Sequence, residues 1–119
     1  MVTIIIPTYN EVKNIKKFEK VLANIKGNFE VIFTDGFSRD GTYDLISYPK
    51  IKEAKYRSNQ MNAGAKYAKG DYLLFLHCDS FIGSDCINLI ERSNLDAGCF
   101  TLKFHPSNSS LKFIEFFSN

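Results

Sequence analysis

The sequence predicts an α/β fold of three layers, α/β/α, in which helices cover both faces of a mainly parallel sheet. Short apolar runs alternate with stretches whose apolar residues recur at helical spacing, along all 119 residues. The run from Tyr72 to Leu76 is apolar at every position, which is typical of a central strand buried on both faces. Strands joined in this way run parallel through right-handed crossovers, so we expect one domain over residues 1–119.

The first strand and the first helix follow directly from the pattern. Val2 to Ile6 is a β-branched run closed by Pro7. Thr8 and Glu11 stand at capping-box spacing, which predicts the start of a helix. Its apolar face is formed by Val12, Ile15, Phe18, Leu22 and Ile25. Gly27 then ends the helix.

A second strand is predicted from Phe29 to Thr34. The segment from Asp35 to Thr42 is rich in turn formers and in cap residues, and it leads into a short helix that ends at Ile46. Ile51 to Tyr56 is a further strand candidate, although its lysines interrupt the apolar pattern.

The second half of the chain continues the alternation. Ser58 is the expected N-cap of a helix that ends at Gly70, just before the central strand. Ser84 and Asp85 cap another short helix, and Ala97 to Phe104 forms a fifth strand.

The C-terminal segment is unusually apolar. It carries Leu111, Phe113, Ile114, Phe116 and Phe117. At helical spacing these side chains cover more than one face, so the domain alone does not bury them easily. We therefore expect a homodimer through the segment from Leu111 to Phe117. The alternative is a helix that folds back onto its own sheet in a monomer.

Composition excludes some classes of protein. Lys plus Arg is 15 and Asp plus Glu is 13, and a net charge of +2 argues against a nucleic-acid partner. No apolar run approaches the roughly 20 residues of a membrane span. The N-terminus lacks the basic start of a signal peptide, so we expect the cytoplasm or, for a longer form, the inner face of the membrane. The 3 cysteines have no CxxC spacing and are expected to be reduced and mostly buried.

Polar clusters follow the strands at Thr8 to Glu11, Asp35 to Asp40, Arg57 to Asn62 and His77 to Asp79. The carboxyl ends of parallel strands share one edge, so these clusters should line one crevice. Together they offer carboxylates, helix N-termini and a guanidinium group, which suit a nucleoside diphosphate. The chain has neither a G-x-G-x-x-G motif nor a P-loop.

His77 and Asp79 are a candidate metal or ligand site. If the strand geometry persists beyond Leu76, the two side chains project from the same face, because side chains alternate with period two. Cys78 would then point to the opposite face, into the core. The alternative is that the strand runs into a loop in which Asp79 caps a turn and His77 is satisfied locally.

Four segments resemble one enzyme family in the right order. Ile4 to Glu11 resembles the opening strand of the GT-A glycosyltransferases of the large inverting family that includes the cellulose, chitin and hyaluronan synthases. Asp35 to Thr42 resembles its D-[DG]-x-S-x-D-G-T segment, and Arg57 to Asp71 resembles its R-x-x-Q-x-N-x-G block. Leu74 to Ser80 is similar to the strand that carries its metal-binding D-x-D. His77 replaces the first Asp, as in a bacterial subgroup with L-F-L-H-A-D-T.

The resemblance implies a binding site for a nucleotide-diphosphate sugar, with UDP as the expected carrier. The residues bordering the nucleoside would be Pro7, Thr8, Tyr9, Asn10 and Glu11. Asp35 would contact the base or ribose, and Arg57 and Asn62 would lie near the base or diphosphate. Asp79 would bind a divalent cation, Mn²⁺ or Mg²⁺, that bridges the phosphates. His77 is either a second ligand, which would favour Mn²⁺, or a spectator.

Length is the larger departure from the family, whose domain is roughly twice this long. The missing half would carry the acceptor site and the catalytic base, which we therefore expect beyond Asn119. The chain is thus predicted to be a truncated, donor-binding half of a metal-assisted inverting glycosyltransferase that is inactive alone. The alternative is a non-catalytic nucleotide-binding or assembly module that needs a partner chain. A nucleotidyltransferase is a weaker rival, because Pro7 to Glu11 contains no glycine. The sugar and the acceptor are not predicted.

Overall fold

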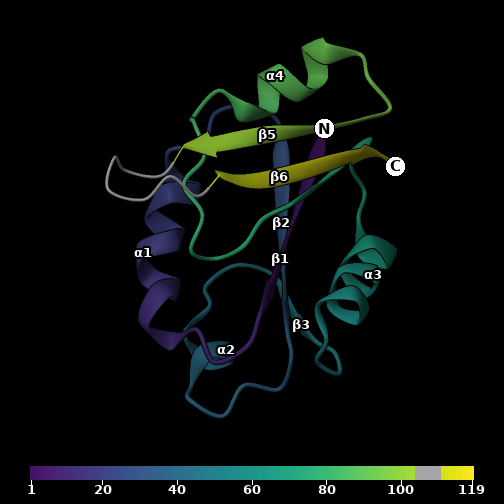
Figure 1. The fold of residues 1–119 in the computed structure, drawn as a ribbon. Helices are drawn as coiled ribbons and strands as arrows, with labels where there is room; N and C mark the ends of the chain where they lie inside the picture. The colour runs from purple at the N-terminus through teal and green to yellow at the C-terminus, as the bar shows by residue number, and fades with distance from the viewer. Residues whose placement is uncertain (104–110) are drawn as a thin grey trace.

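The computed structural model describes residues 1–103 and 111–119. Within these residues one sheet has the strand order β3-β2-β1-β4-β6-β5 (Figure 1). The strands are β1 (Val2–Thr8), β2 (Phe29–Asp35), β3 (Lys50–Lys52), β4 (Tyr72–Phe75), β5 (Ala97–Lys103) and β6 (Leu111–Ser118). The helices are α1 (Val12–Ala23), α2 (Thr42–Leu45), α3 (Arg57–Tyr67) and α4 (Cys86–Ser93). The predicted α/β class is confirmed.

β1 is the centre of the parallel part of the sheet and lies between β2 and β4. Every residue of β1 is buried, in keeping with its apolar, β-branched sequence. Ile4 pairs with Val31 on one side and with Leu74 on the other, and the predicted parallel direction of these strands is confirmed. β3 adds to the far side of β2, also parallel.

Helices cover both faces of the sheet, and α1 and α3 stand on opposite sides of β1 and β2 in Figure 1. The main core on the α1 side contains Ile4 and Ile6 of β1, Ile15, Phe18 and Leu22 of α1, and Ile87 and Ile90 of α4. On the other face α3 approaches β1 closely at Gly64. This arrangement confirms the three predicted layers.

The predicted capping box of Thr8 and Glu11 is wrong. Thr8 is the last residue of β1, and α1 begins at Val12 without a side-chain cap from Glu11. The backbone N–H of Val12 donates to Asp40 at 3.2 Å, and that of Glu11 donates to the Thr42 hydroxyl oxygen at 2.8 Å. These acceptors come from the loop after β2 and from the first residue of α2, which a local sequence window does not contain.

Two other predicted boundaries also shift. β3 covers Lys50–Lys52, so only Ile51 and Lys52 of the strand predicted from Ile51 to Tyr56 lie in it. Its parallel partner β2 ends at Asp35, opposite Lys52, so the chain beyond Lys52 has no partner strand. α3 begins at Arg57 rather than after Ser58, and no side-chain cap precedes it.

The helical expectation for the C-terminal segment is wrong. Leu111–Ser118 forms strand β6, antiparallel to both β4 and β5. Phe116 is 4% exposed and Phe117 is 39% exposed, as expected where side chains alternate between faces. Edge-to-face contacts join Tyr72 to Phe116 and Phe75 to Phe117. Aromatic cross-strand pairs of this kind favour a strand over a helix.

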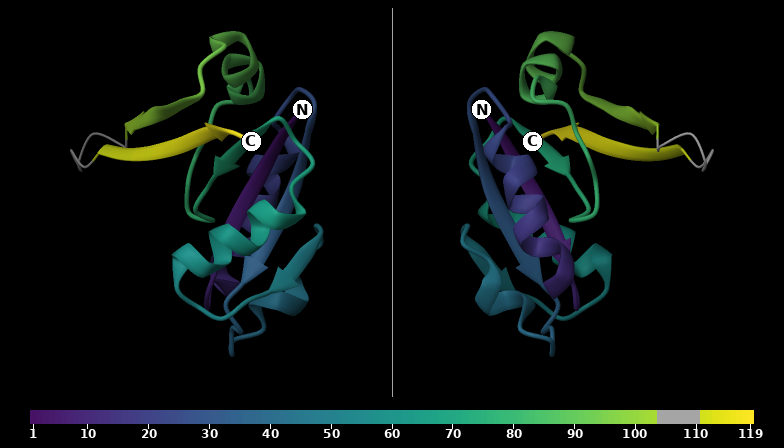
Figure 2. Two further views of the ribbon diagram at one scale, coloured as in Figure 1. Left: turned by 90° about the vertical axis from the view of Figure 1, so that its right-hand side faces the viewer. Right: turned by 90° about the vertical axis from the view of Figure 1, so that its left-hand side faces the viewer.

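β6 also changes the place of the predicted fifth strand. β5 runs in the same direction as β4, but β6 lies between them. Figure 2 shows β5 and β6 extending to one side of the parallel core. Phe104, the predicted last residue of this strand, lies outside the described residues.

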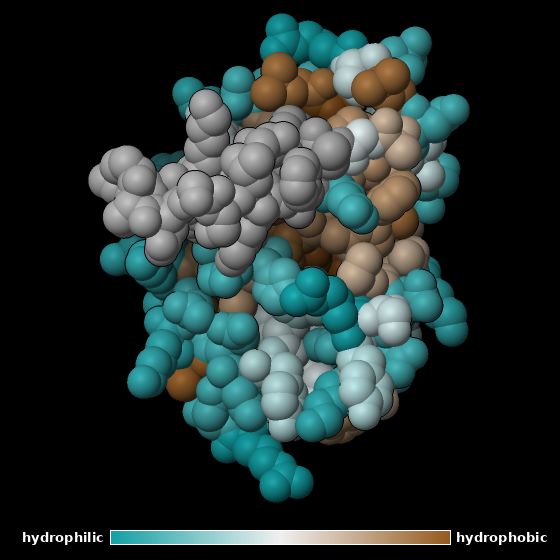
Figure 3. All heavy atoms as spheres, viewed as in Figure 1, coloured by the Kyte–Doolittle hydropathy of each residue, from teal (hydrophilic) through white to brown (hydrophobic). Residues whose placement is uncertain are grey.

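Apolar side chains gather on the surface near α4 and β6, whereas the end of the molecule that holds α2 is mostly hydrophilic (Figure 3). Leu89 and Leu95 are 41% and 53% exposed. None of the helices in the described part of the chain has the length and apolar character needed to cross a membrane.

Gly64→Ala should lower the free energy of unfolding by about 1–3 kcal/mol, measured by chemical denaturation. A Cβ at this position would lie 2.5 Å from Cγ2 of Ile5, which outweighs the better helix propensity of alanine. Gly83→Ala is the control, because its Cβ would meet only the end of the Asp85 side chain. Equal stability of the two variants would contradict the close packing of α3 on β1.

Candidate functional site

A pocket of about 230 Å³ opens where β1 ends, beside the start of α3 and the turn after β4. It is lined by Pro7, Thr8, Tyr9, Glu11, Lys55, Tyr56, Arg57, Gln60 and His77. The carboxyl ends of adjacent parallel strands therefore form the crevice that the polar clusters predict.

Gln60 joins the strand ends below the pocket to helix α3. Its side-chain amide donates to the carbonyl oxygens of Thr8 and Thr34, each at 2.8 Å, and the residue is only 3% exposed. The N–H of Gly36 also donates to the Thr8 oxygen at 2.9 Å. These bonds satisfy carbonyl groups at the ends of β1 and β2 and fix the first turn of α3 against them.

Asp35 is completely buried below this pocket. One carboxylate oxygen accepts from the Thr8 hydroxyl at 2.8 Å and from the Ser38 hydroxyl at 2.7 Å, and the other accepts from the Ser38 N–H at 2.8 Å. The carboxylate thus caps the turn after β2, a role that the sequence also allows. Contact with a nucleoside remains a prediction.

The turn after β2 is tied to the loop after β1. Asn10 donates its N–H to the Ser38 hydroxyl at 2.8 Å and accepts from the N–H of Arg39 at 2.9 Å. Phe37, 57% exposed, has a φ of 59°. A side chain in this left-handed conformation is held there by its surroundings, here by the bonds of Ser38 to Asp35.

Asp40 anchors the start of α1. The Thr42 hydroxyl hydrogen bond, together with weaker bonds from backbone donors including Val12, holds the pKa of Asp40 below its ordinary value, although desolvation opposes this. Asp40 therefore stays ionised near neutral pH and is a good acceptor for the N-terminal amides of α1.

His77 and Asp79 lie on a turn rather than on an extended strand. β4 ends at Phe75, and the N–H of Ser80 donates to the carbonyl oxygen of His77 at 3.0 Å. The turn brings Nδ1 of His77 to 3.8 Å from Oδ1 of Asp79, and both side chains are partly exposed, at 37% and 46%. The imidazole and the carboxylate therefore lie close together, as expected, but on a turn, as in the alternative in which the strand runs into a loop.

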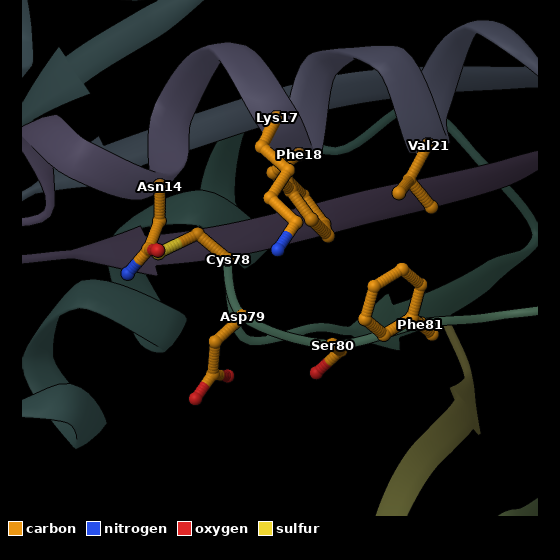
Figure 4. Close-up of a pocket in the computed structure, with 8 residues that line it drawn as sticks. All are labelled: Asn14, Lys17, Phe18, Val21, Cys78, Asp79, Ser80 and Phe81. Carbon is orange, nitrogen blue, oxygen red and sulfur yellow. The ribbon is translucent and has the colours of Figure 1, made fainter. Parts of the chain in front are cut away.

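Asp79 lines a second, smaller pocket of about 80 Å³. Figure 4 shows the smaller pocket between α1 and the turn after β4, with Lys17 on the α1 side and Ser80 and Phe81 opposite. The carboxylate of Asp79 points away from α1 in this view.

The turn after β4 offers only part of a donor set for a metal ion. Within residues 1–103 and 111–119, no group of three or more His, Cys, Asp and Glu side chains could hold a metal ion. An imidazole and a carboxylate from His77 and Asp79 nevertheless fit a divalent cation such as Mn²⁺ whose other positions are filled by ligand oxygens.

The described cysteine thiols are not candidate nucleophiles. Cys78 is 3% exposed, as predicted, and burial together with the nearby Glu11 carboxylate raises the pKa of its thiol far above the ordinary value. Burial raises the pKa of Cys86 to about 11. Both thiols remain protonated and unreactive near neutral pH.

The pocket brings together most of the predicted binding residues: Pro7, Thr8, Tyr9, Glu11, Arg57 and His77. Asn10, Asp35, Asn62 and Asp79 do not line it, and Asn62 is exposed on α3. Sequence reasoning gave no role to Lys55, Tyr56 and Gln60. Gln60 could have been found, because it shares the sheet-facing side of α3 with Ala63 and Gly64 at helical spacing.

Comparison with known proteins identifies the family. Residues 3–109 match the family described as "Glycosyl transferase family 2". An Escherichia coli protein named "UDP-Glc:alpha-D-GlcNAc-diphosphoundecaprenol beta-1,3-glucosyltransferase WfaP" is 34% identical over 92 residues, which are 68% of this chain and 36% of that protein. The chain spans between 16% and 36% of the length of the curated relatives that it matches.

Solved structures share the fold. The mannosyltransferase PcManGT from Pyrobaculum calidifontis, in complex with GDP-Man and Mn²⁺, matches with a TM-score of 0.77 and 18% identity over 98% of this chain and 44% of that chain. S. aureus TarS 1-349 in complex with UDP matches with a TM-score of 0.66 and 24% identity over 81% of this chain and 33% of that chain. At these identities the likeness concerns the GT-A fold.

Gln60→Leu should lower the free energy of unfolding by about 1–3 kcal/mol, because it leaves the buried Thr34 carbonyl without its donor. Asn59→Leu, at the neighbouring exposed position of α3, should change it by no more than about 0.5 kcal/mol. Chemical denaturation of both variants measures the difference. If they unfold alike, the Gln60 amide is not what joins α3 to the strand ends.

Proposed function

The chain belongs to glycosyl transferase family 2, and we propose that it forms the donor-binding part of an enzyme that transfers a sugar from a nucleotide-diphosphate sugar to an acceptor with inversion. The observation that carries this proposal is the pocket at the carboxyl ends of β1 and β4, which both Arg57 and His77 line. A guanidinium group recognises phosphate oxygens well, and this edge of the sheet is where α/β folds bind nucleotides.

We propose UDP as the carrier of the sugar. At about 230 Å³ the pocket is smaller than typical pockets for whole drug-sized ligands, which supports binding of the nucleoside with the diphosphate extending toward His77 and Asp79. The name of the E. coli relative contains UDP-Glc, and a TarS structure holds UDP. Pro7, Thr8, Tyr9 and the loop after them would border the nucleoside.

His77 and Asp79 would hold a divalent cation against the diphosphate. Such an ion, when bound, stabilises the negative charge of the departing nucleoside diphosphate. Asp79 supplies the carboxylate, and the His77 imidazole favours Mn²⁺ over Mg²⁺. The Mn²⁺ in the mannosyltransferase structure supports divalent-ion use. His77 at this position also supports the subgroup in which histidine replaces the first Asp of D-x-D.

The acceptor site and the base that deprotonates the acceptor hydroxyl are proposed to lie beyond Asn119. The small share of the relatives' length that the chain spans supports this division. The second candidate function is a nucleotide-binding module without turnover that works with a partner chain. The apolar side chains that gather on the surface near α4 and β6, where Phe117 of β6 is 39% exposed, favour it, since an exposed apolar surface suits a protein partner.

Asp79→Asn should weaken UDP binding in the presence of Mn²⁺ by about tenfold or more and remove the dependence on the ion, because it loses the carboxylate charge. His77→Ala should cause a smaller loss. Titration calorimetry with UDP, with and without Mn²⁺, measures both effects. Asp96→Asn, a change at an exposed site after α4, is the control. Unchanged affinity and ion dependence in Asp79→Asn would contradict the proposed metal role.

The 119-residue chain alone should transfer no sugar from UDP-glucose, because the proposed base lies outside it.

We also propose a two-fold dimer through the C-terminal segment, now as strand β6 rather than a helix. Light scattering at micromolar concentration should give twice the chain mass, and Phe117→Glu should halve it. Sugar transfer by the chain alone would refute the first expectation, and a monomer would refute the second.

A further inference from the structure

Lys55 lines the pocket but lies outside the four motif segments on which the sequence resemblance was recognised. Its ammonium nitrogen is 4.6 Å from the centre of the Tyr9 ring and 3.5 Å from the Tyr9 hydroxyl oxygen. The backbone of Lys55 is packed against Gly36, where an added Cβ would come within 2.9 Å of the Lys55 Cβ. Lys55 is therefore held at the end of the pocket where β2 finishes.

A charged donor stands at this end of the pocket. The Lys55 ammonium carries N–H donors and no acceptor. The carboxylate of Asp35 is completely buried and accepts from Thr8 and Ser38. The side-chain nitrogen of Gln60 is used by two backbone carbonyls.

The acidic side chain that lines the pocket lies toward α1. Glu11 accepts from the side-chain amide of Asn14 at 2.7 Å and neighbours the thiol of Cys78. Lys55 instead stands against Tyr9 and Gly36. A ligand group beside Lys55 therefore meets a cation, and the favourable partner is an oxygen acceptor.

We propose that Lys55 selects nucleobases with a carbonyl oxygen at the position where cytosine and adenine carry an exocyclic amino group. Uracil O4 and guanine O6 accept hydrogen bonds, whereas the amino groups of cytosine and adenine donate them. Tyr9 is the positioning residue, because its ring face holds the ammonium group in place. The inference rests on the proposed function, in which the diphosphate lies at the His77 end and the base at the Lys55 end.

The test measures the affinity of the whole chain for UDP, CDP, GDP and ADP in the presence of Mn²⁺ by calorimetry. The unaltered chain should bind UDP about tenfold more tightly than CDP, and GDP more tightly than ADP, since the amino group of cytosine or adenine presents donors rather than an acceptor to the Lys55 ammonium. Lys55→Met should weaken UDP and GDP by about tenfold and leave CDP and ADP within about twofold. Lys55→Arg, which keeps a donor and a charge, should preserve most of the discrimination.

Lys52→Met is the matched control, because Lys52 lies over Tyr43 and does not line the pocket. It should leave the ratio of UDP to CDP affinity unchanged. An equal loss for all four nucleotides in Lys55→Met would mean that Lys55 binds the diphosphate, which overturns the inference. Unchanged UDP binding in Lys55→Met would also overturn it while leaving the proposed function intact. Failure of the unaltered chain to bind any of the nucleotides would overturn both.

Discussion

The amide of Gln60 is the interaction on which the site depends. Parallel strands end with carbonyl groups that no further strand can satisfy, and here those of Thr8 and Thr34 are buried. One side-chain nitrogen bonds both, so α3 must begin at the edge where β1 and β2 end. The absence of a side chain at Gly64 lets the helix lie close enough to β1 for this contact. Tyr56 and Arg57 reach the pocket because they precede Gln60 on the same first turn.

Asp35 joins the loops after β1 and β2, as Gln60 joins α3 to the strand ends. Its buried carboxylate accepts hydrogen bonds from the hydroxyl groups of Thr8 and Ser38. The Ser38 hydroxyl in turn accepts a hydrogen bond from the backbone N–H of Asn10. The loops after β1 and β2 thus form one hydrogen-bonded unit around a charge that has no access to solvent. Such a charge is costly to bury unless it is fully hydrogen-bonded, which gives the unit a defined conformation. Tyr9 and Phe37, whose side chains are exposed, belong to this unit.

The sequence predicts the parallel part of the fold well, because its strands are apolar on both faces and its helices on one. Ile4, Val31 and Leu74 could be placed in adjacent strands from these patterns alone. The C-terminal segment could not, because adjacent aromatic residues such as Phe116 and Phe117 fit neither period clearly, and their pairing with β4 is a long-range contact. The crevice was predictable from strand ends, whereas Lys55 was not, since its place depends on contacts with Gly36 and Tyr9 from distant segments.

The two ends of the pocket differ in their chemistry, and this difference gives a bound ligand a direction. At one end Lys55 offers donors, while the buried carboxylate of Asp35 is already engaged. At the other end the turn after β4 brings a carboxylate and an imidazole together, which attract a cation rather than an anion. A ligand that is neutral and rich in carbonyl oxygens at one end and anionic enough to share a divalent ion at the other satisfies both. A nucleoside diphosphate with an oxo base has this polarity. In the reverse orientation its base would lie beside Asp79, and its diphosphate could not share a divalent ion held by His77 and Asp79.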